Sequence, residues 1–295
     1  MAYGITPNLT NISDKGLQEA WIGGMASAMD ADLSFVRFFP YDGMTYSTAG
    51  YAPPSPYSAN VPEGNDVDTE SIAETYTKNI TVSQYTLGWG MSLLAKSTLP
   101  TDVTVGLYRE LGGLAVRFFA GKVADLLNNA AGTTTTADGV ALASASHTSD
   151  AGNQSNYINS NLAFTAYESA VRNMWQMKNH KGVHMGARPN MLLTNPALDV
   201  TSFQILNATH NADNRSTPNP NSGRGVSVNI LPEITATTFW SLLDTAKTTF
   251  RAPVVRGPSP WVVEFDEKSG NYYVRDIIAA GFGIVDWRGY VQGDT

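Results

Sequence analysis

The chain has 295 residues, enough for one large domain or two lobes that share a hydrophobic core, and its lack of cysteine excludes disulfides, thiolate catalysis and cysteine-ligated metal sites. Its 26 acidic and 19 basic residues give a net charge of −7, which argues against a protein that grips nucleic acid through a basic face. Only 15% of the residues are charged, against about 25% in an ordinary soluble domain, so much of the surface is neutral and suits either contact with other chains or a monomer rich in Thr, Asn and Ser.

The N-terminal residues predict an arm with one short helix and one extended piece. The apolar side chains of the helix are Leu17, Trp21, Ile22 and Met25, and the extended piece covers residues 33–39, including Phe35. The first residues lack the charged and apolar pattern of a signal peptide, and no apolar run approaches the roughly 18 residues of a membrane span. We therefore expect a protein that is made and kept in a cytoplasm and that has no membrane partner.

Tyrosine, proline and glycine dominate the next stretch, which contains Tyr41, Tyr46, Tyr51, Tyr57, Gly43, Gly50, Pro53, Pro54 and Pro56. It has too few aliphatic residues for a core of its own, and its prolines prevent a helix, so it must be a long excursion that packs on something else. Because the tyrosines are interleaved with Pro and Gly and not with Lys or Arg, we interpret them as contacts to another protein chain and not as a platform for bases.

Five acids and no base follow, at Glu63, Asp66, Asp68, Glu70 and Glu74. They lack the ligand spacing of an EF-hand loop, so a solvated or partner-facing acidic edge is favoured over a calcium site. The alternation of apolar residues from Ile72 to Trp89 then predicts one strand that runs back along the excursion.

The clearest helix of the sequence covers residues 103–129, with Asp102 as its N-cap. Leu111, Phe118 and Leu126 belong to a series of apolar residues that recurs at steps of three and four, and we expect them on its core face. At about 1.5 Å per residue the helix would be roughly 40 Å long.

The second half of the sequence alternates helices, strands and polar loops. Residues 133–161 form a low-complexity loop that is too long for an ordinary connection, so it is functional, mobile or held by neighbours. A second helix, with apolar residues from Phe164 to Trp175, ends near Lys178 to Gly182, and a third follows Asn195-Pro196, with proline at its first position. We expect a polar loop at 211–225 and strands at residues 188–194, 226–230, 239–243, 261–265 and 272–278.

The histidines do not complete a metal or catalytic site. His180 and His184 have the spacing of two ligands one helical turn apart, but the residues between them follow a helix end and no acid lies nearby. His147 stands beside Ser146 and near Asp150, yet in a loop without the strand-turn-helix context of a nucleophile elbow. A loop histidine is the favoured interpretation.

Glycine motifs do not complete a nucleotide site either. Gly281-Phe282-Gly283 lacks the third glycine of a dinucleotide fingerprint and favours a strand with tight packing. Because no catalytic set of residues is present, we expect no enzymatic activity, no cofactor and no metal, and a protein that works by its shape.

The order of elements resembles the α+β, Hong Kong 97-like fold of tailed-phage major capsid proteins, more closely the Mu-like head-subunit branch. The segments that carry this resemblance, in order along residues 33–290, are Val123-Ala124-Asp125-Leu126-Leu127-Asn128-Asn129, Asp138-Gly139-Val140-Ala141-Leu142 with His147, Arg188-Pro189-Asn190-Met191-Leu192-Leu193-Thr194-Asn195-Pro196-Ala197-Leu198, Ile205-Leu206-Asn207-Ala208 with Asn219-Pro220, Phe239-Trp240-Ser241-Leu242-Leu243-Asp244 and Tyr273-Val274-Arg275-Asp276.

The resemblance implies a division of the chain and a function. Residues 1–44 would be the N-terminal arm, 45–85 the E-loop, 86–131 and 245–295 the peripheral domain with its spine helix, and 132–244 the axial domain. The protein would assemble in a bacterial host cytoplasm into hexamers and pentamers of a virion shell that encloses double-stranded DNA without sequence-specific binding. Scaffold, portal and decoration proteins would be its further partners.

The E-loop of such proteins lies over the neighbouring subunit, which accounts for an aromatic excursion without its own core. Heterologous contacts of this kind close into rings. We expect the contact residues of the E-loop and arm to be Tyr46, Tyr51, Pro53, Pro54, Tyr57, Glu63, Asp66, Asp68, Trp21 and Phe35. Lys78, the only lysine between residues 16 and 95, lies off the expected tip, so we expect no covalent cross-link between subunits.

Two other classes of function stay open at this stage. A soluble carbohydrate- or peptide-binding protein would use the tyrosine-rich residues 41–57 as a concave aromatic site. A hydrolase would depend on His147 or His184, and it has the least support from the sequence.

Overall fold

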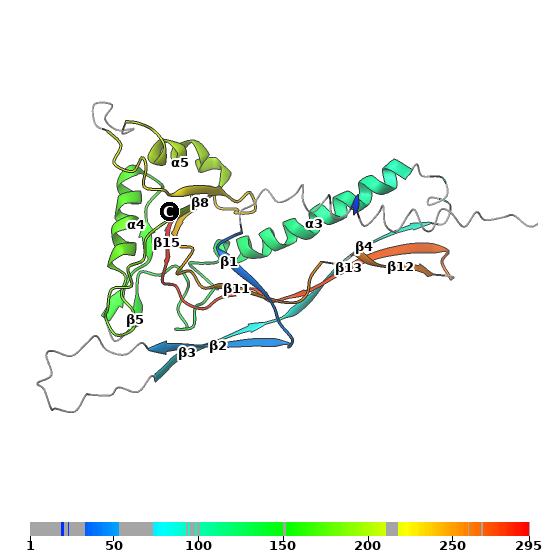
Figure 1. Cartoon of the computed structure of the whole chain (residues 1–295), viewed down its shortest axis with the longest axis horizontal. Coiled ribbons are helices and arrows are strands. Elements are labelled where there is room, and N and C mark those ends of the chain that lie inside the picture. Colours follow the sequence, from blue (N-terminus) through cyan, green and yellow to red (C-terminus); the bar gives the residue numbers. More distant parts are fainter. Residues whose placement is uncertain are drawn as a thin grey trace, which may run out of the picture.

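The computed structural model describes Glu19, Ala20, Gly23, Leu94, Thr98 and residues 33–52, 73–92, 101–149, 152–210, 218–258, 260–266 and 268–294. A long body, in which helix α3 (Thr101–Asn128) lies along an extended sheet, joins a broader lobe that contains the last strand (Figure 1). No helix within these described residues is both long and apolar enough to cross a membrane.

The sheet of the body has six strands. Its order is β1 (Val36–Pro40), β11 (Phe250–Arg256), β13 (Asn271–Ala280) and β12 (Pro260–Asp266), with β4 (Ser83–Ser92) also paired to β13 and β14 (Gly283–Ile284) to β11. The β1 and β11 strands are parallel, and the other pairs are antiparallel. All ten residues of β13 pair with β4, which makes this the longest strand pair described in the body.

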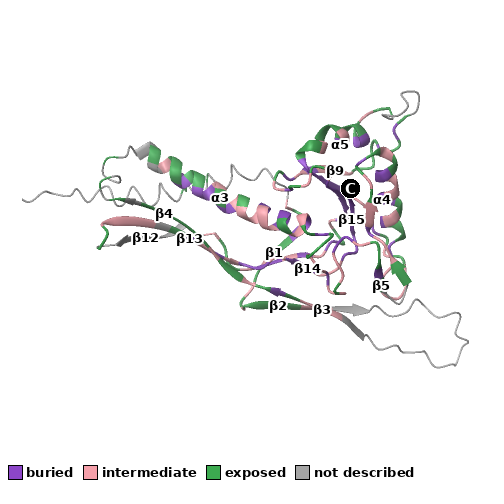
Figure 2. Cartoon of the chain, turned by 180° about the vertical axis from the view of Figure 1, so that it is seen from behind, coloured by how far each residue is buried: buried purple, intermediate pink, exposed green. Residues whose placement is uncertain are grey.

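Helix α3 confirms the helix predicted at 103–129. Leu111 and Ala115 are buried against Ile278 and Ala280 of β13, as the apolar spacing predicts. The last turns enter the lobe, where Leu127 is fully buried. The helix therefore ties the two parts together, with more exposed surface toward its N-terminal end (Figure 2).

The lobe is built around a second sheet. Its order is β7 (Tyr157–Asn159), β15 (Tyr290–Asp294), β10 (Trp240–Leu243), β8 (Met191–Thr194) and β9 (Ser227–Ile230). The helices α4 (Phe164–Gln176), η1 (Pro196–Leu198) and α5 (Asp199–Leu206) belong to the same lobe. Every residue of β8 and β10 is buried, so these central strands read as apolar runs and not as alternating ones.

Local signals predicted the lobe helices well. Helix α4 contains the apolar residues expected of it but ends at Gln176, a little before the predicted end near Lys178. The side chain of Asn195 accepts a hydrogen bond from the Ala197 N–H at 2.8 Å, with Pro196 at the first helical position, as the capping pattern predicts. The last strand, β15, lies in the lobe sheet beside β10.

One predicted strand is wrong in the structure, and strand β11 was not predicted. The run from Ile72 to Trp89 is not one strand, because β3 (Ala73–Thr81) ends and β4 begins around Val82, whose N–H donates to the Met44 carbonyl at 2.8 Å. The chain changes partner there, from β2 (Thr45–Ala52) to β13. Strand β11 is absent from the sequence prediction, since its arginines and Pro253 hide a strand that gains its partners only from distant segments.

Candidate functional site

The β2–β3 hairpin is the feature of the fold that leaves the body. Its strands pair antiparallel from Thr45↔Thr81 to Ala52↔Ala73, with an irregularity between Ala49 and Tyr51. Among the described residues it pairs with no other strand, and it extends away from the six-stranded sheet (Figure 1). An eight-residue strand is about 25 Å long, and residues 53–72 connect the far ends of the two strands.

One face of β3 holds the hairpin to the rest of the chain. Tyr76, Lys78 and Ile80 alternate with exposed Thr77, Asn79 and Thr81, and alternate residues of a strand share a face. The three inward side chains contact three different segments. The hairpin is therefore fixed along β3 and not only at its ends.

Ile80 anchors the base of the hairpin. Its side chain is 3% exposed and lies against Gly281 and Gly283. A Cβ atom added to Gly283 would lie 2.8 Å from Ile80 Cγ1, and one added to Gly281 would lie 2.9 Å from the Thr81 carbonyl oxygen. The tight packing predicted for Gly281-Phe282-Gly283 is confirmed, and its reason is the close approach of β3.

Lys78 and Tyr76 attach the middle of the hairpin to the lobe. Lys78 Nζ donates to the carbonyl oxygen of Thr135 at 2.8 Å and contacts its Oγ1 at 3.1 Å. The rings of Tyr76 and His180 meet edge-on, with centroids 5.7 Å apart. Burial lowers the pKa of Lys78, and the negative charge of Asp138 opposes that effect.

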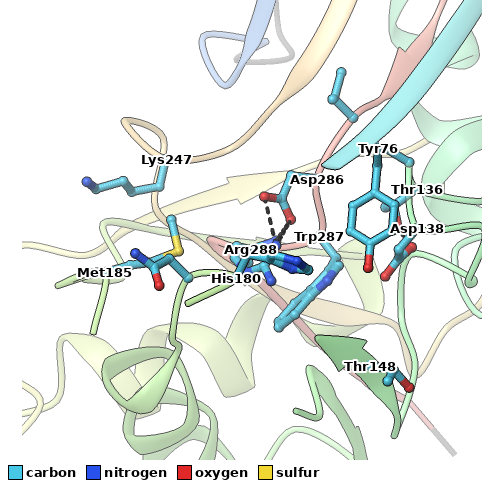
Figure 3. Close-up of a pocket in the computed structure, with 13 residues that line it drawn as sticks. Tyr76, Thr136, Asp138, Thr148, His180, Met185, Lys247, Asp286, Trp287 and Arg288 are labelled. Atoms are coloured by element: carbon cyan, nitrogen blue, oxygen red, sulfur yellow. Dashed lines mark hydrogen bonds and ion pairs between the residues drawn. The ribbon is translucent and has the colours of Figure 1, made fainter. Parts of the chain in front are cut away.

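A pocket of about 370 Å³ lies where the hairpin meets the lobe (Figure 3). Its lining includes Tyr76, Asp138, His180, Lys247 and Arg288. Arg288 Nη1 donates to both carboxylate oxygens of Asp286 at 3.1 Å, and its Nε donates to the Lys178 carbonyl at 2.9 Å. The wall of this pocket is thus fixed by an ion pair that is itself tied to the backbone.

Asp138, which lines the pocket, forms a buried pair with His147. His147 Nδ1 lies 2.8 Å from Asp138 Oδ2, and its Nε2 lies 3.2 Å from Asn156 Oδ1. The His147 ring stacks on Trp287, with centroids 4.3 Å apart and planes 15° apart. Burial alone would raise the pKa of Asp138, but hydrogen bonds from His147, Thr136 and the Val140 N–H outweigh it and hold that pKa below its usual value.

This chemistry suits a structural role. The His147 side chain is inaccessible and both of its ring nitrogens are engaged, so it cannot take a proton from a bound substrate. His180 and His184 are not on a helix. The ring of His180 meets Tyr76, whereas the backbone of His184 forms an isolated antiparallel β-bridge with Lys178. Within the described ranges, no three histidine or acidic side chains gather as a metal site would require.

The predicted contact residues fall into three groups. Tyr46 is half-buried and packs on Phe39 and Tyr41, with ring centroids 5.0 and 5.5 Å apart, so it belongs to the hairpin base. Tyr51 lies in β2 opposite Glu74. The residues outside the described ranges are Trp21, Pro53, Pro54, Tyr57, Glu63, Asp66 and Asp68.

Phe35 does not lie on the surface, where the prediction of a subunit contact would need it. It is 3% exposed, belongs to the main core and meets Phe250 edge-on, with ring centroids 5.2 Å apart. An apolar ring beside the first strand of the sheet is drawn into the chain's own core. The predicted helix core holds: Leu111 is buried, and Phe118 and Leu126 are half-buried against the core clusters.

Lys78 and Ile80 position the hairpin, and the Asp138–His147 pair fixes the loop beside it; none of these roles was predicted from the sequence. The alternation of Tyr76, Lys78 and Ile80 is a strand pattern with one inward face, and it is the signal that could have found the first two. The nine-residue separation of Asp138 and His147 carries no such signal, because only the folded loop brings them together.

Comparisons with known proteins bear on the whole chain. A family model described as "Phage capsid protein" matches residues 74–292. No curated protein matches the sequence. The chain is similar in structure to a virus-like particle protein from Pyrococcus furiosus, with 10% identity, a TM-score of 0.58 and coverage of 95% of this chain and 99% of the other.

Two phage structures show the same fold. The match to Microbacterium phage Oxtober96 has 11% identity and a TM-score of 0.57, and covers 90% of this chain and 91% of the other. The match to the capsid of Myoviridae phage XM1 has 11% identity and a TM-score of 0.52, and covers 88% of this chain and 90% of the other.

Proposed function

This chain belongs to the phage capsid protein family, and from that premise we propose that it builds an icosahedral phage head from hexamers and pentamers, joined where the β2–β3 hairpin of one subunit lies over the next. It is a structural protein of the bacteriophage head. The α+β, Hong Kong 97-like fold predicted from the sequence is confirmed by its capsid-protein neighbours.

The observation that carries this proposal is a hairpin that the chain holds by one face and leaves open at its edge. Tyr76, Lys78 and Ile80 fix β3 to the body and lobe. The outer edge of β2 has no strand partner among the described residues. Such an extension is unfavourable in a monomer, because an exposed strand edge promotes pairing with other chains. It suits a subunit whose neighbour supplies the missing contacts.

The finer assignments follow the resemblance. We place the chain in the Mu-like branch, with residues 1–44 as arm, 45–85 as E-loop, 86–131 and 245–295 as peripheral domain and 132–244 as axial domain at the centre of each capsomer. Assembly takes place in the host cytoplasm with scaffold, portal and decoration proteins as partners. The net charge of −7 suits a wall that encloses DNA without holding its phosphates, and the protein has no enzymatic role.

The ligand-binding alternative has no support from the geometry. Its proposed site, the tyrosines of residues 41–57, would need accessible rings around a hollow. Tyr41 and Tyr46 instead pack on each other, and the Tyr41 hydroxyl donates to the Thr45 carbonyl at 2.6 Å.

The test removes the segment beyond the hairpin. Residues 53–72 are replaced by Asn-Gly, which joins Ala52 to its cross-strand partner Ala73 through a two-residue turn. We expect a folded subunit, with the circular dichroism and unfolding curve of the wild type, that no longer forms particles in light scattering and negative-stain microscopy. Particles of normal size from this variant, or a wild-type chain that stays monomeric at all concentrations with and without scaffold, would contradict the proposal.

A further inference from the structure

Two arginines stand side by side on the sheet next to the hairpin base. Strands β1 and β11 are parallel, and their register places Arg37 directly opposite Arg251. Directly opposite residues of paired strands project from the same face, so the two guanidinium groups share one surface. Strand β1 leads into the hairpin, which places this surface at the hairpin's base (Figure 1).

The face is the one turned away from helix α3. Phe38, the residue after Arg37, meets Phe119 of α3 at 5.7 Å. Phe39 lies on the opposite face, where it meets Tyr46 of the hairpin. Because side chains alternate along a strand, Arg37 shares the face of Phe39 and lies beside the hairpin and not beneath the helix.

Neither arginine has a carboxylate partner in the described part of the chain. Arg37 is exposed and makes no described hydrogen bond or ion pair. Arg251 is half-buried, and its Nη1 reaches only the carbonyl of Phe250, at 3.5 Å. Burial and the positive charge of Arg37 both lower the pKa of Arg251. Like charges placed directly opposite each other destabilise a sheet, so this arrangement is unfavourable for the subunit alone.

The remaining chain has a segment of complementary charge. Glu63, Asp66, Asp68, Glu70 and Glu74 are five acids without a base in one stretch of the sequence. The stretch begins beyond the far end of the hairpin, and the seven residues from Tyr46 to Ala52 already span about 20 Å. A hairpin that lies over the next subunit carries these acids to that subunit and away from its own arginines.

Resting on the proposed function, we propose that Arg37 and Arg251 form the receiving site for the acidic stretch 63–74 of a second copy of this chain. The guanidinium groups would take its carboxylates through charge-assisted hydrogen bonds, which are the strongest of their kind and suit planar arginine forks. A surface that weakens the subunit is then stabilised by the contact that builds the shell.

The test combines charge removal with charge exchange. In the variant R37Q/R251Q we expect the subunit concentration required for assembly to rise about tenfold or more. The reason is that the glutamines cannot form charge-assisted hydrogen bonds with the acidic stretch, which weakens the contact between subunits. The unfolding midpoint of the free subunit should stay equal or rise, because the like-charge contact is gone. Arg109→Gln, an exposed arginine on α3, is the matched control and should assemble as the wild type does.

Charge exchange identifies the partner. We expect R37E/R251E to abolish assembly, and the same chain with E63K, D66K, D68K and E70K added to form particles again, because each exchanged acidic stretch then meets an exchanged receiving site in hexamers and pentamers alike. Normal assembly of R37Q/R251Q overturns the inference while leaving the shell function intact. Normal particles that fail to retain DNA would also overturn it, because they would assign the arginines to nucleic-acid phosphates. A wild-type chain that never assembles would instead refute the proposed function.

Discussion

The buried Asp138–His147 pair yields the sharpest prediction, because both side chains are held by hydrogen-bond partners that the structure describes. Asn156 donates through Nδ2 to the Leu142 carbonyl at 2.6 Å and accepts the Ser144 N–H at Oδ1, at 2.9 Å. These two bonds fix the amide orientation, so Oδ1 faces His147 Nε2 as an acceptor. With the Asp138 carboxylate facing Nδ1, each ring nitrogen of His147 lies against a side-chain oxygen, and the ring is fixed between Asp138 and Asn156.

The magnitude follows from the burial of the pair. The side chains of His147 and Asp138 are 0% and 7% exposed, so solvent screens their interaction little. His147→Phe leaves the buried carboxylate without its side-chain partner, and we expect it to lower the free energy of unfolding by about 3–5 kcal/mol. Asp138→Asn keeps the shape but removes a charged acceptor, at a cost of about 1.5–3 kcal/mol. The double variant should cost less than the sum of the two, because each single change leaves the other partner uncompensated.

Urea unfolding of the unassembled subunit measures these costs. Trp287, stacked on His147, reports the site by fluorescence, and the dependence on denaturant should keep its wild-type slope. His210→Gln, an exposed histidine, is the matched control and should change the free energy by less than about 0.5 kcal/mol. Single-variant costs below about 1 kcal/mol, or strictly additive costs, would refute the assignment of a coupled buried pair.

Three further predictions concern the same region. Gly283→Val places side-chain atoms where β3 is seated and should abolish assembly in electron microscopy, whereas Gly106→Ala, which meets no atom within 4 Å, should assemble normally. Because the pKa of Asp138 is held below its usual value of 3.8, its contribution to stability is complete above that pH and is lost as the pH falls below it; unfolding free energies between about pH 5 and pH 2 should fall less steeply in Asp138→Asn. Lys78→Met removes the bond to Thr135, at a cost of about 1–2 kcal/mol, and should speed hydrogen exchange of the β3 amides; unchanged exchange would show that this bond does not hold the hairpin.

Helices were predictable from the sequence because their signals are local. The spacing of Leu111, Phe118 and Leu126 identifies the buried face of α3, and Asn195-Pro196 marks the start of the next helix. Each signal needs only residues a few positions apart. The fold class followed from the order of such elements and not from any single one.

Strand partners were not predictable, because they depend on distant segments. The break at Val82 exists because β3 finds β2 while β4 finds β13, almost two hundred residues further along the chain. The low-complexity loop after α3 is held partly by contacts within itself, His147 to Asp138 and Asn156 to Leu142, and partly by the stacking of His147 on the distant Trp287. No periodicity of the sequence links these residues. Composition marked that loop as unusual, and only tertiary contact shows what holds it.

The direction of the hairpin is decided by its anchors and not by its own strands. Ile80 rests on the end of the body sheet, whereas Lys78 and Tyr76 contact the lobe. A rotation of about 10° at these anchors would move the far end of a 25 Å strand by about 4 Å, which is close to the spacing of neighbouring strands. The proposed contact between the hairpin and the next subunit therefore depends on the relative placement of body and lobe, which Lys78, Tyr76 and Ile80 link to the direction of β3.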